Sequence, residues 1–101
     1  MFTSEIIDTL QEGSHELEVG ATAETQYDPD AGTISVTLGS FARCASAAGD
    51  SEPLMRAWLP ATEQVTGHLA HEEATAWAQD VFQSWAKKVR AAIPHELRSS
   101  Q

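Results

Sequence analysis

The residues best suited to chemistry in this sequence are His68, His71 and Glu72. On a helix, His68 and His71 would share a face, and two imidazoles with a carboxylate form a ligand set that binds zinc or iron. The order differs from the zinc-hydrolase signatures, in which the histidines are four residues apart and the inverted form ends in Glu-His. We therefore keep a small-molecule or metal-binding protein that uses these three residues as the alternative function. We assign no metal and no cofactor.

Nucleophilic catalysis has little support in the sequence. Cys44 lies in the segment ARCASAA, whose small apolar residues favour a buried structural thiol over a reactive one. The sequence contains neither the Gly-x-Ser-x-Gly elbow of serine hydrolases nor a glycine-rich phosphate loop. We therefore predict that the chain is not an enzyme.

The formal charge of −9 is concentrated in the first part of the chain. Eight acidic residues and no lysine or arginine precede Arg43, which gives this part a charge of −8. The six basic and seven acidic residues from Arg43 onward give −1. Contacts to nucleic-acid phosphates require lysine and arginine, so direct nucleic-acid binding is disfavoured. The asymmetry favours a protein partner with a basic surface.

The first twelve residues have the pattern of a short helix. Thr3 or Ser4 can cap its N-terminus, and Gly13 suits the position after its last residue. The apolar residues fall on one face of this helix: Phe2, Ile6, Ile7 and Leu10. We predict a helix from residue 3 to residue 12 that docks on the rest of the domain, because so short a helix is marginal alone.

From His15 onward, apolar residues recur at every second position, which is the period of a half-buried strand. Residues 15–28 and 33–42 are predicted to form an antiparallel hairpin around a turn-forming Asp-Pro-Asp-Ala-Gly segment. Gly39 is a candidate bulge, because Phe41 falls out of phase with the inward residues before it.

The middle of the chain is ambiguous. Residues 54–59 fit either a third strand or a short helix, and we prefer the strand because a wider sheet covers more of the following helix. Residues 62–69 fit an edge strand or a connecting loop.

Residues 70–93 show the clearest period, which is that of an amphipathic helix. Glu72 and Glu73 near its start suit the helix dipole, and Pro94 stops it. The apolar stripe consists of Ala74, Trp77, Ala78, Val81, Phe82, Trp85, Val89, Ala92 and Ile93. We predict that this stripe covers one face of the sheet. Part of it also offers a surface for a homodimer.

These elements predict one α+β domain over residues 1–101. It comprises a short N-terminal helix, an antiparallel sheet of three to four strands and a long C-terminal helix, with residues 95–101 as a frayed tail. The sequence contains no apolar run long enough for a membrane span and no basic, apolar N-terminal signal. The single Cys44 agrees with a reducing compartment. We therefore expect a cytoplasmic protein of a bacterium or phage.

The predicted order of helix, strand, strand, possible strand and helix resembles that of the double-stranded RNA-binding domain. That family has basic residues at the start of its second helix, where this chain has His71, Glu72 and Glu73, so RNA binding is rejected. The acidity, the size and the element order also resemble those of bacterial type III secretion chaperones, which dimerise and hold secreted effectors. This second resemblance extends over most of the chain and implies a protein partner.

The sequence thus predicts a non-catalytic, acidic protein-interaction module. Its partner would be a protein with a basic surface. The module itself would then act as an inhibitor, a nucleic-acid mimic or a protein like a type III secretion chaperone. The predicted partner-binding residues are acids of the first helix and the first strand: Glu5, Asp8, Glu12, Glu16, Glu18 and Glu24. We expect neither a nucleic acid nor a membrane as a direct partner.

Overall fold

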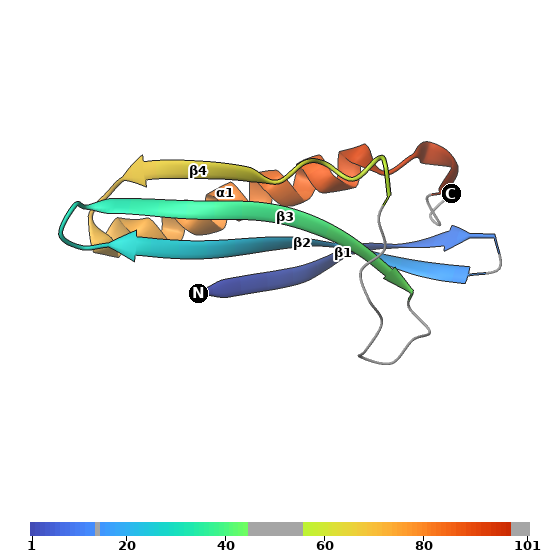
Figure 1. The fold of residues 1–101 in the computed structure, drawn as a ribbon, viewed down its shortest axis with the longest axis horizontal. Coiled ribbons are helices and arrows are strands. Elements are labelled where there is room, and N and C mark those ends of the chain that lie inside the picture. Colours follow the sequence, from blue (N-terminus) through green and yellow to red (C-terminus); the bar gives the residue numbers. More distant parts are fainter. Residues whose placement is uncertain (14, 45–55, 98–101) are drawn as a thin grey trace.

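The computed structural model describes residues 1–13, 15–44 and 56–97. Its elements are β1 (Phe2–Glu12), β2 (His15–Asp28), β3 (Thr33–Cys44), β4 (Glu63–His68), α1 (His71–Ala92) and the short 3-10 helix η1 (His95–Leu97). The strands pair antiparallel in chain order, and α1 runs along one side of the sheet (Figure 1). The predicted α+β class, with an antiparallel sheet and a long C-terminal helix packed on it, is confirmed.

The first element is a strand, so the predicted helix over residues 3–12 is wrong. β1 pairs with β2, and the register shifts between Ile6 and Asp8, which makes Ile7 the extra residue of a β-bulge. The bulge breaks the period of two, so that Ile6, Ile7 and Leu10 acquire the spacing of a helical stripe. Pairing also provides main-chain hydrogen bonds that satisfy this segment, whereas a helix of this length is marginal.

The predicted hairpin is confirmed, with β3 continuing to Cys44. In its turn, the Asp28 carboxylate accepts hydrogen bonds from the amides of Asp30 and Ala31, at 3.0 and 3.3 Å. Gly32 has a φ of 65°, which a residue with a side chain rarely adopts. The pairing of β2 with β3 is continuous, so the bulge expected at Gly39 is absent from this pair.

The third strand predicted at residues 54–59 is not formed by the part that the structure describes. Arg56 to Leu59 make a turn in which the Leu59 amide donates to the Arg56 carbonyl at 3.1 Å, and residues 54 and 55 lie outside the described residues. Pro60 follows directly and cannot donate a ladder hydrogen bond. The remaining strand is β4, which confirms the edge strand that was one of two interpretations of residues 62–69.

Helix α1 confirms the predicted helix to within one residue at each end. Its buried residues Ala74, Phe82, Trp85 and Val89 pack with Ile93 against the inward side of the sheet. That side contributes the buried residues Leu10, Leu17, Val19, Ala21, Ala23, Ile34, Val36, Leu38 and Ala42. Within the described residues, no helix is long and apolar enough to cross a membrane.

Two tryptophans of α1 fit the helix to the sheet. The indole Nε1 of Trp85 donates a hydrogen bond of 2.7 Å to the carbonyl of Gly39 in β3, and Trp85 is 3% exposed. Gly67 in β4 leaves room for Trp77, because a Cβ at this position would lie 3.0 Å from the Trp77 ring. The hydrogen bond to Gly39 and the close contact at Gly67 hold the helix close to β3 and β4.

The opposite side of the sheet, which we call the open face, is not covered by α1. There the ring of Phe41 lies over Gly20, its partner across β2 and β3, and a Cβ at Gly20 would collide with this ring. Phe41 therefore falls out of phase because it belongs to the open face, where it shields the backbone of a buried glycine.

The C-terminal segment turns back after α1. The Leu97 amide donates to the Pro94 carbonyl at 3.0 Å, and Leu97 packs against the core. Of the tail predicted to fray, residues 95–97 thus form η1, and residues 98–101 lie outside the described residues.

We predict that Trp85→Phe lowers the free energy of unfolding by about 1–3 kcal/mol, because the Gly39 carbonyl loses the donor supplied by the buried indole. Trp58→Phe is the matched control, since Trp58 is only half-buried. Chemical denaturation followed by circular dichroism measures both. Equal losses in the two variants would show that ring volume, rather than the hydrogen bond, explains the effect.

We predict that Gly20→Ala destabilises the protein by about 1–3 kcal/mol, because the added methyl group displaces the Phe41 ring. In a Phe41→Ala background the same change should cost distinctly less, since the obstructing ring is gone. A double-mutant cycle of unfolding free energies measures this coupling. Additive losses would contradict the contact.

Candidate functional site

The acidic residues predicted to bind a partner lie on the hairpin of β1 and β2, and the sheet separates them into two sets. Glu5 and Asp8 pair with the buried, inward-facing Ala21 and Val19, so they belong to the α1 side at the edge of the sheet. The residues of the second set alternate with the inward ones along β2 and lie on the open face: Glu16, Glu18 and Glu24. Glu12 ends β1.

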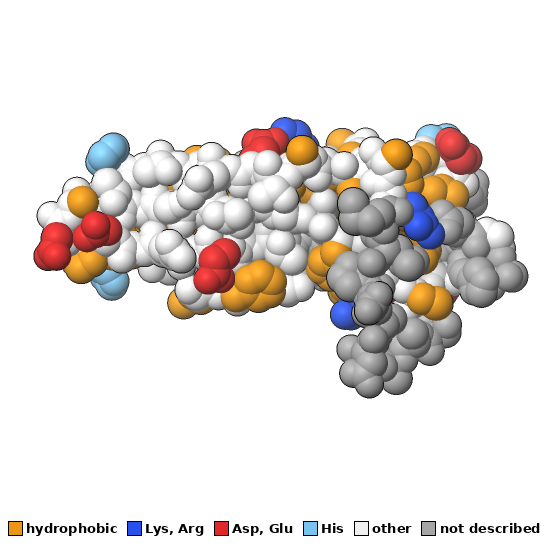
Figure 2. All heavy atoms as spheres, in the orientation of Figure 1, with side chains coloured by type: hydrophobic (Ala, Val, Ile, Leu, Met, Phe, Trp, Pro, Cys, Tyr) orange, Lys and Arg blue, Asp and Glu red, His pale blue; other side chains and the backbone are white. Residues whose placement is uncertain are grey.

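The open face is mostly flat and uncharged. Figure 2 shows the molecule from this side, with isolated acidic and hydrophobic side chains on a largely uncharged surface. Strand pairing orders these residues into rows across β1, β2 and β3. From the N-terminal end of β1, the rows are Phe2–Glu24–Thr37, Ser4–Thr22–Gly39, Ile6–Gly20–Phe41 and Thr9–Glu18–Arg43.

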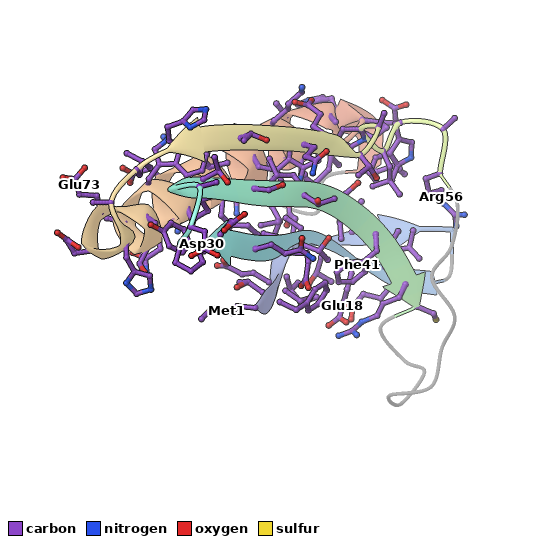
Figure 3. All side chains as sticks on the ribbon, turned by 60° about the vertical axis from the view of Figure 1, so that its left-hand side comes forward. Met1, Glu18, Asp30, Phe41, Arg56 and Glu73 are labelled. Carbon is purple, nitrogen blue, oxygen red and sulfur yellow. The ribbon has the colours of Figure 1, made fainter. Side chains whose placement is uncertain are left out.

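Arg43 partly neutralises this face. Its guanidinium forms an ion pair of 2.9 Å with Glu18 and lies 5.6 Å from the centre of the Phe41 ring. Glu18 and Phe41 lie near each other in Figure 3, which agrees with their positions on neighbouring strands. Arg43 is the only lysine or arginine of the four described strands. The remaining negative charge on the open face therefore belongs mainly to Glu16, which is exposed, and Glu24, which is half-buried.

A groove of about 790 Å³ lies on the other side of the sheet, between the beginning of β1 and α1. Small residues at its base, Ala23, Ala74 and Ala78, leave the space unfilled. Its polar lining includes Thr3, Glu5, Thr25, Tyr27, His71, Thr75, Gln79, Asp80 and Gln83, with no lysine or arginine. Near the β1 bulge, the Arg90 guanidinium donates to the Ile7 carbonyl at 2.8 Å, which links α1 to β1.

The residues of the alternative site are separated by the fold. His68 lies in β4 and His71 in α1, so the two histidines do not share a helix face. His71 opens α1 and packs edge-to-face on Tyr27, with 5.1 Å between ring centres. Tyr27 in turn donates to the Leu69 carbonyl at 3.2 Å, so His71 helps to fix the link between β4 and α1. Within the described residues, no three His, Cys, Asp or Glu side chains are grouped closely enough to hold a metal ion.

The sequence reasoning missed the exposed hydrophobic residues at the start of β1. Phe2, Ser4 and Ile6 alternate with Thr3 and Glu5, which is the period of a strand, but Ile7 interrupts the pattern. It also missed the groove, which depends on how far α1 diverges from β1. The strand period at the start of β1 extends over only five residues, which is too short to predict an exposed hydrophobic edge. The small residues Ala74 and Ala78 of α1 did not predict the groove.

No family model, no curated protein and no solved structure matches this chain. Both family resemblances drawn from the sequence begin with an N-terminal helix, and β1 replaces that helix. The functional argument therefore rests on the surfaces of the chain itself.

Proposed function

We propose that this chain is a non-catalytic protein-interaction module whose open face binds a basic surface of a partner protein. The observation that carries the proposal is the sign of the few charges on the strands of this face, which are acidic except for one arginine. The β2 strand presents Glu16, Glu18 and Glu24 there, and Arg43, already paired with Glu18, is the only lysine or arginine in the four described strands. A partner that brings lysine or arginine to this face complements it.

The fold supports this role by holding the carboxylates in place. β2 is paired on both sides, with β1 and β3, so Glu16, Glu18 and Glu24 project from a backbone fixed along its length. Flexible loops would lose conformational entropy on binding, whereas a rigid strand loses little. Surface charges at this spacing act mainly on the association rate and on the choice of partner.

The partner that fits is a basic protein segment with a flat contact surface. A nucleic-acid mimic needs a dense row of free carboxylates, and the pairing of Glu18 with Arg43 leaves the open face with a sparser set. An inhibitor or a chaperone-like holder of a basic target agrees better with this pattern. We place this interaction in the cytoplasm, in line with the single cysteine of the chain.

We predict that the double variant Glu16→Gln, Glu24→Gln loses its partner in pull-downs from a lysate of the native host. Glu72→Gln, Glu73→Gln is the matched control, because it removes the same charge from the exposed start of α1. Partners bound at roughly 50 mM salt should be released from the native chain at about 500 mM, since screening shortens the reach of surface charges. Quantitative mass spectrometry of the bound proteins measures both effects.

Retention of the same partners by the β2 variant would contradict the proposal. Equal loss in both double variants would also contradict it, because net charge alone would then explain the binding. Partners that remain bound at high salt would point to an apolar interface.

A further inference from the structure

The exposed large hydrophobic residues among the described ones all lie in the first six positions. Met1, Phe2 and Ile6 are 86%, 64% and 39% exposed. β1, which holds Phe2 and Ile6, is an edge strand of the sheet. An edge strand presents unpaired main-chain groups, and hydrophobic side chains beside them make it a template for another strand. The start of β1 therefore combines two features that favour strand addition.

The hydrogen bonds at the N-terminus show which main-chain groups face outward. The Met1 amine donates to the Thr25 carbonyl at 2.9 Å, and the Thr25 amide donates to the Met1 carbonyl at 2.8 Å. Met1 and Thr25 are thus a hydrogen-bonded pair, and such pairs alternate along an antiparallel ladder. It follows that the amides and carbonyls of Phe2, Ser4 and Ile6 point away from β2, toward the open edge.

We infer that this edge binds a second copy of the chain, with β1 antiparallel to β1 and Ser4 opposite Ser4. Phe2 and Ile6 are equally distant from Ser4, so each Phe2 lies opposite Ile6 of the second copy. All three outward-facing residues then form hydrogen-bonded pairs, which supplies about six main-chain hydrogen bonds across the two-fold axis. The two sheets become one continuous sheet.

Side chains favour the same register. Within one chain, Phe2 pairs with Glu24 and Ile6 with Gly20, so both hydrophobic side chains lie on the open face. Across the interface, Phe2 of one copy would pack on Ile6 of the other. On the α1 side, Glu5 lies opposite Thr3 of the second copy. A register centred on Glu5 would also match outward-facing groups, but it would set two carboxylates directly opposite each other, which is unfavourable.

The surroundings of the edge define the length of the paired segment. Beyond Ile6 the bulge interrupts the strand, and the Ile7 carbonyl accepts its bond from Arg90. On the α1 side, Thr3 and Glu5 line the groove between β1 and α1. Of the helical stripe, considered from the sequence as a dimer surface, Ala74, Phe82, Trp85, Val89 and Ile93 are buried against the sheet. The second copy therefore binds at β1.

Sedimentation equilibrium over a range of protein concentrations tests this inference, which stands independently of the proposed basic partner. The native chain should dimerise with a dissociation constant on the order of micromolar, because the paired segment is short. Ser4→Pro should weaken the dimer at least about tenfold, since proline removes an outward amide at the two-fold axis while the hydrogen bonds from β1 to β2 remain. Ser4→Ala keeps this amide and should dimerise like the native chain.

Ile6→Lys provides a second variant, because it places a charge on the open face opposite Phe2 and should also give monomers. Circular dichroism and chemical denaturation establish that each variant folds. Hydrogen exchange of the peptide covering residues 2–6 should slow as the native protein concentration rises. A native chain that stays monomeric, or a dimer that survives both Ser4→Pro and Ile6→Lys, would overturn the inference.

Discussion

One helix covers only one face of a sheet, and this limit governs most of the structure. The most buried residues of the α1 stripe pack on the inward side of the sheet, where Trp85 donates to the Gly39 carbonyl and holds the helix on β3. The other face must tolerate water, so β2 and β3 alternate buried aliphatic residues with threonine, serine and glutamate. The edges of the sheet are also left uncovered by the helix. The two surfaces with functional potential, the open face and the β1 edge, are the consequence of having a single covering element.

The elements with a long period were predictable from the sequence. β2, β3 and α1 were correctly placed because the period of a strand or of a helix extends over most of each segment. β1 was mistaken for a helix because one inserted residue, Ile7, turns a period of two into spacings of three and four. The segment before Pro60 was mistaken for a strand, because Trp58 and Leu59 are apolar and pack against the core from a turn. In both places the local order of apolar residues did not reveal how the segment contacts the rest of the sheet.

The acidic charge of the candidate site was predictable from the sequence, whereas the positions of its carboxylates on the sheet were not. Composition alone identified the acidic hairpin. The face on which each carboxylate lies depends on the register between strands, and the bulge in β1 changes the side of every residue before it. As a result, Glu5 borders the groove while Glu24 lies on the open face. The ion pair that neutralises Glu18 joins residues 25 positions apart, and the sequence has no signal for it.

The bond between Arg90 and the Ile7 carbonyl joins residues 83 positions apart. On the ribosome, the hairpins of β1, β2 and β3 can pair in the order in which they emerge, because each strand meets its neighbour locally. The bulge in β1 acquires its arginine only when almost the entire chain has been made. β1 is therefore completed only after the strands that follow it have paired and α1 has packed on the sheet.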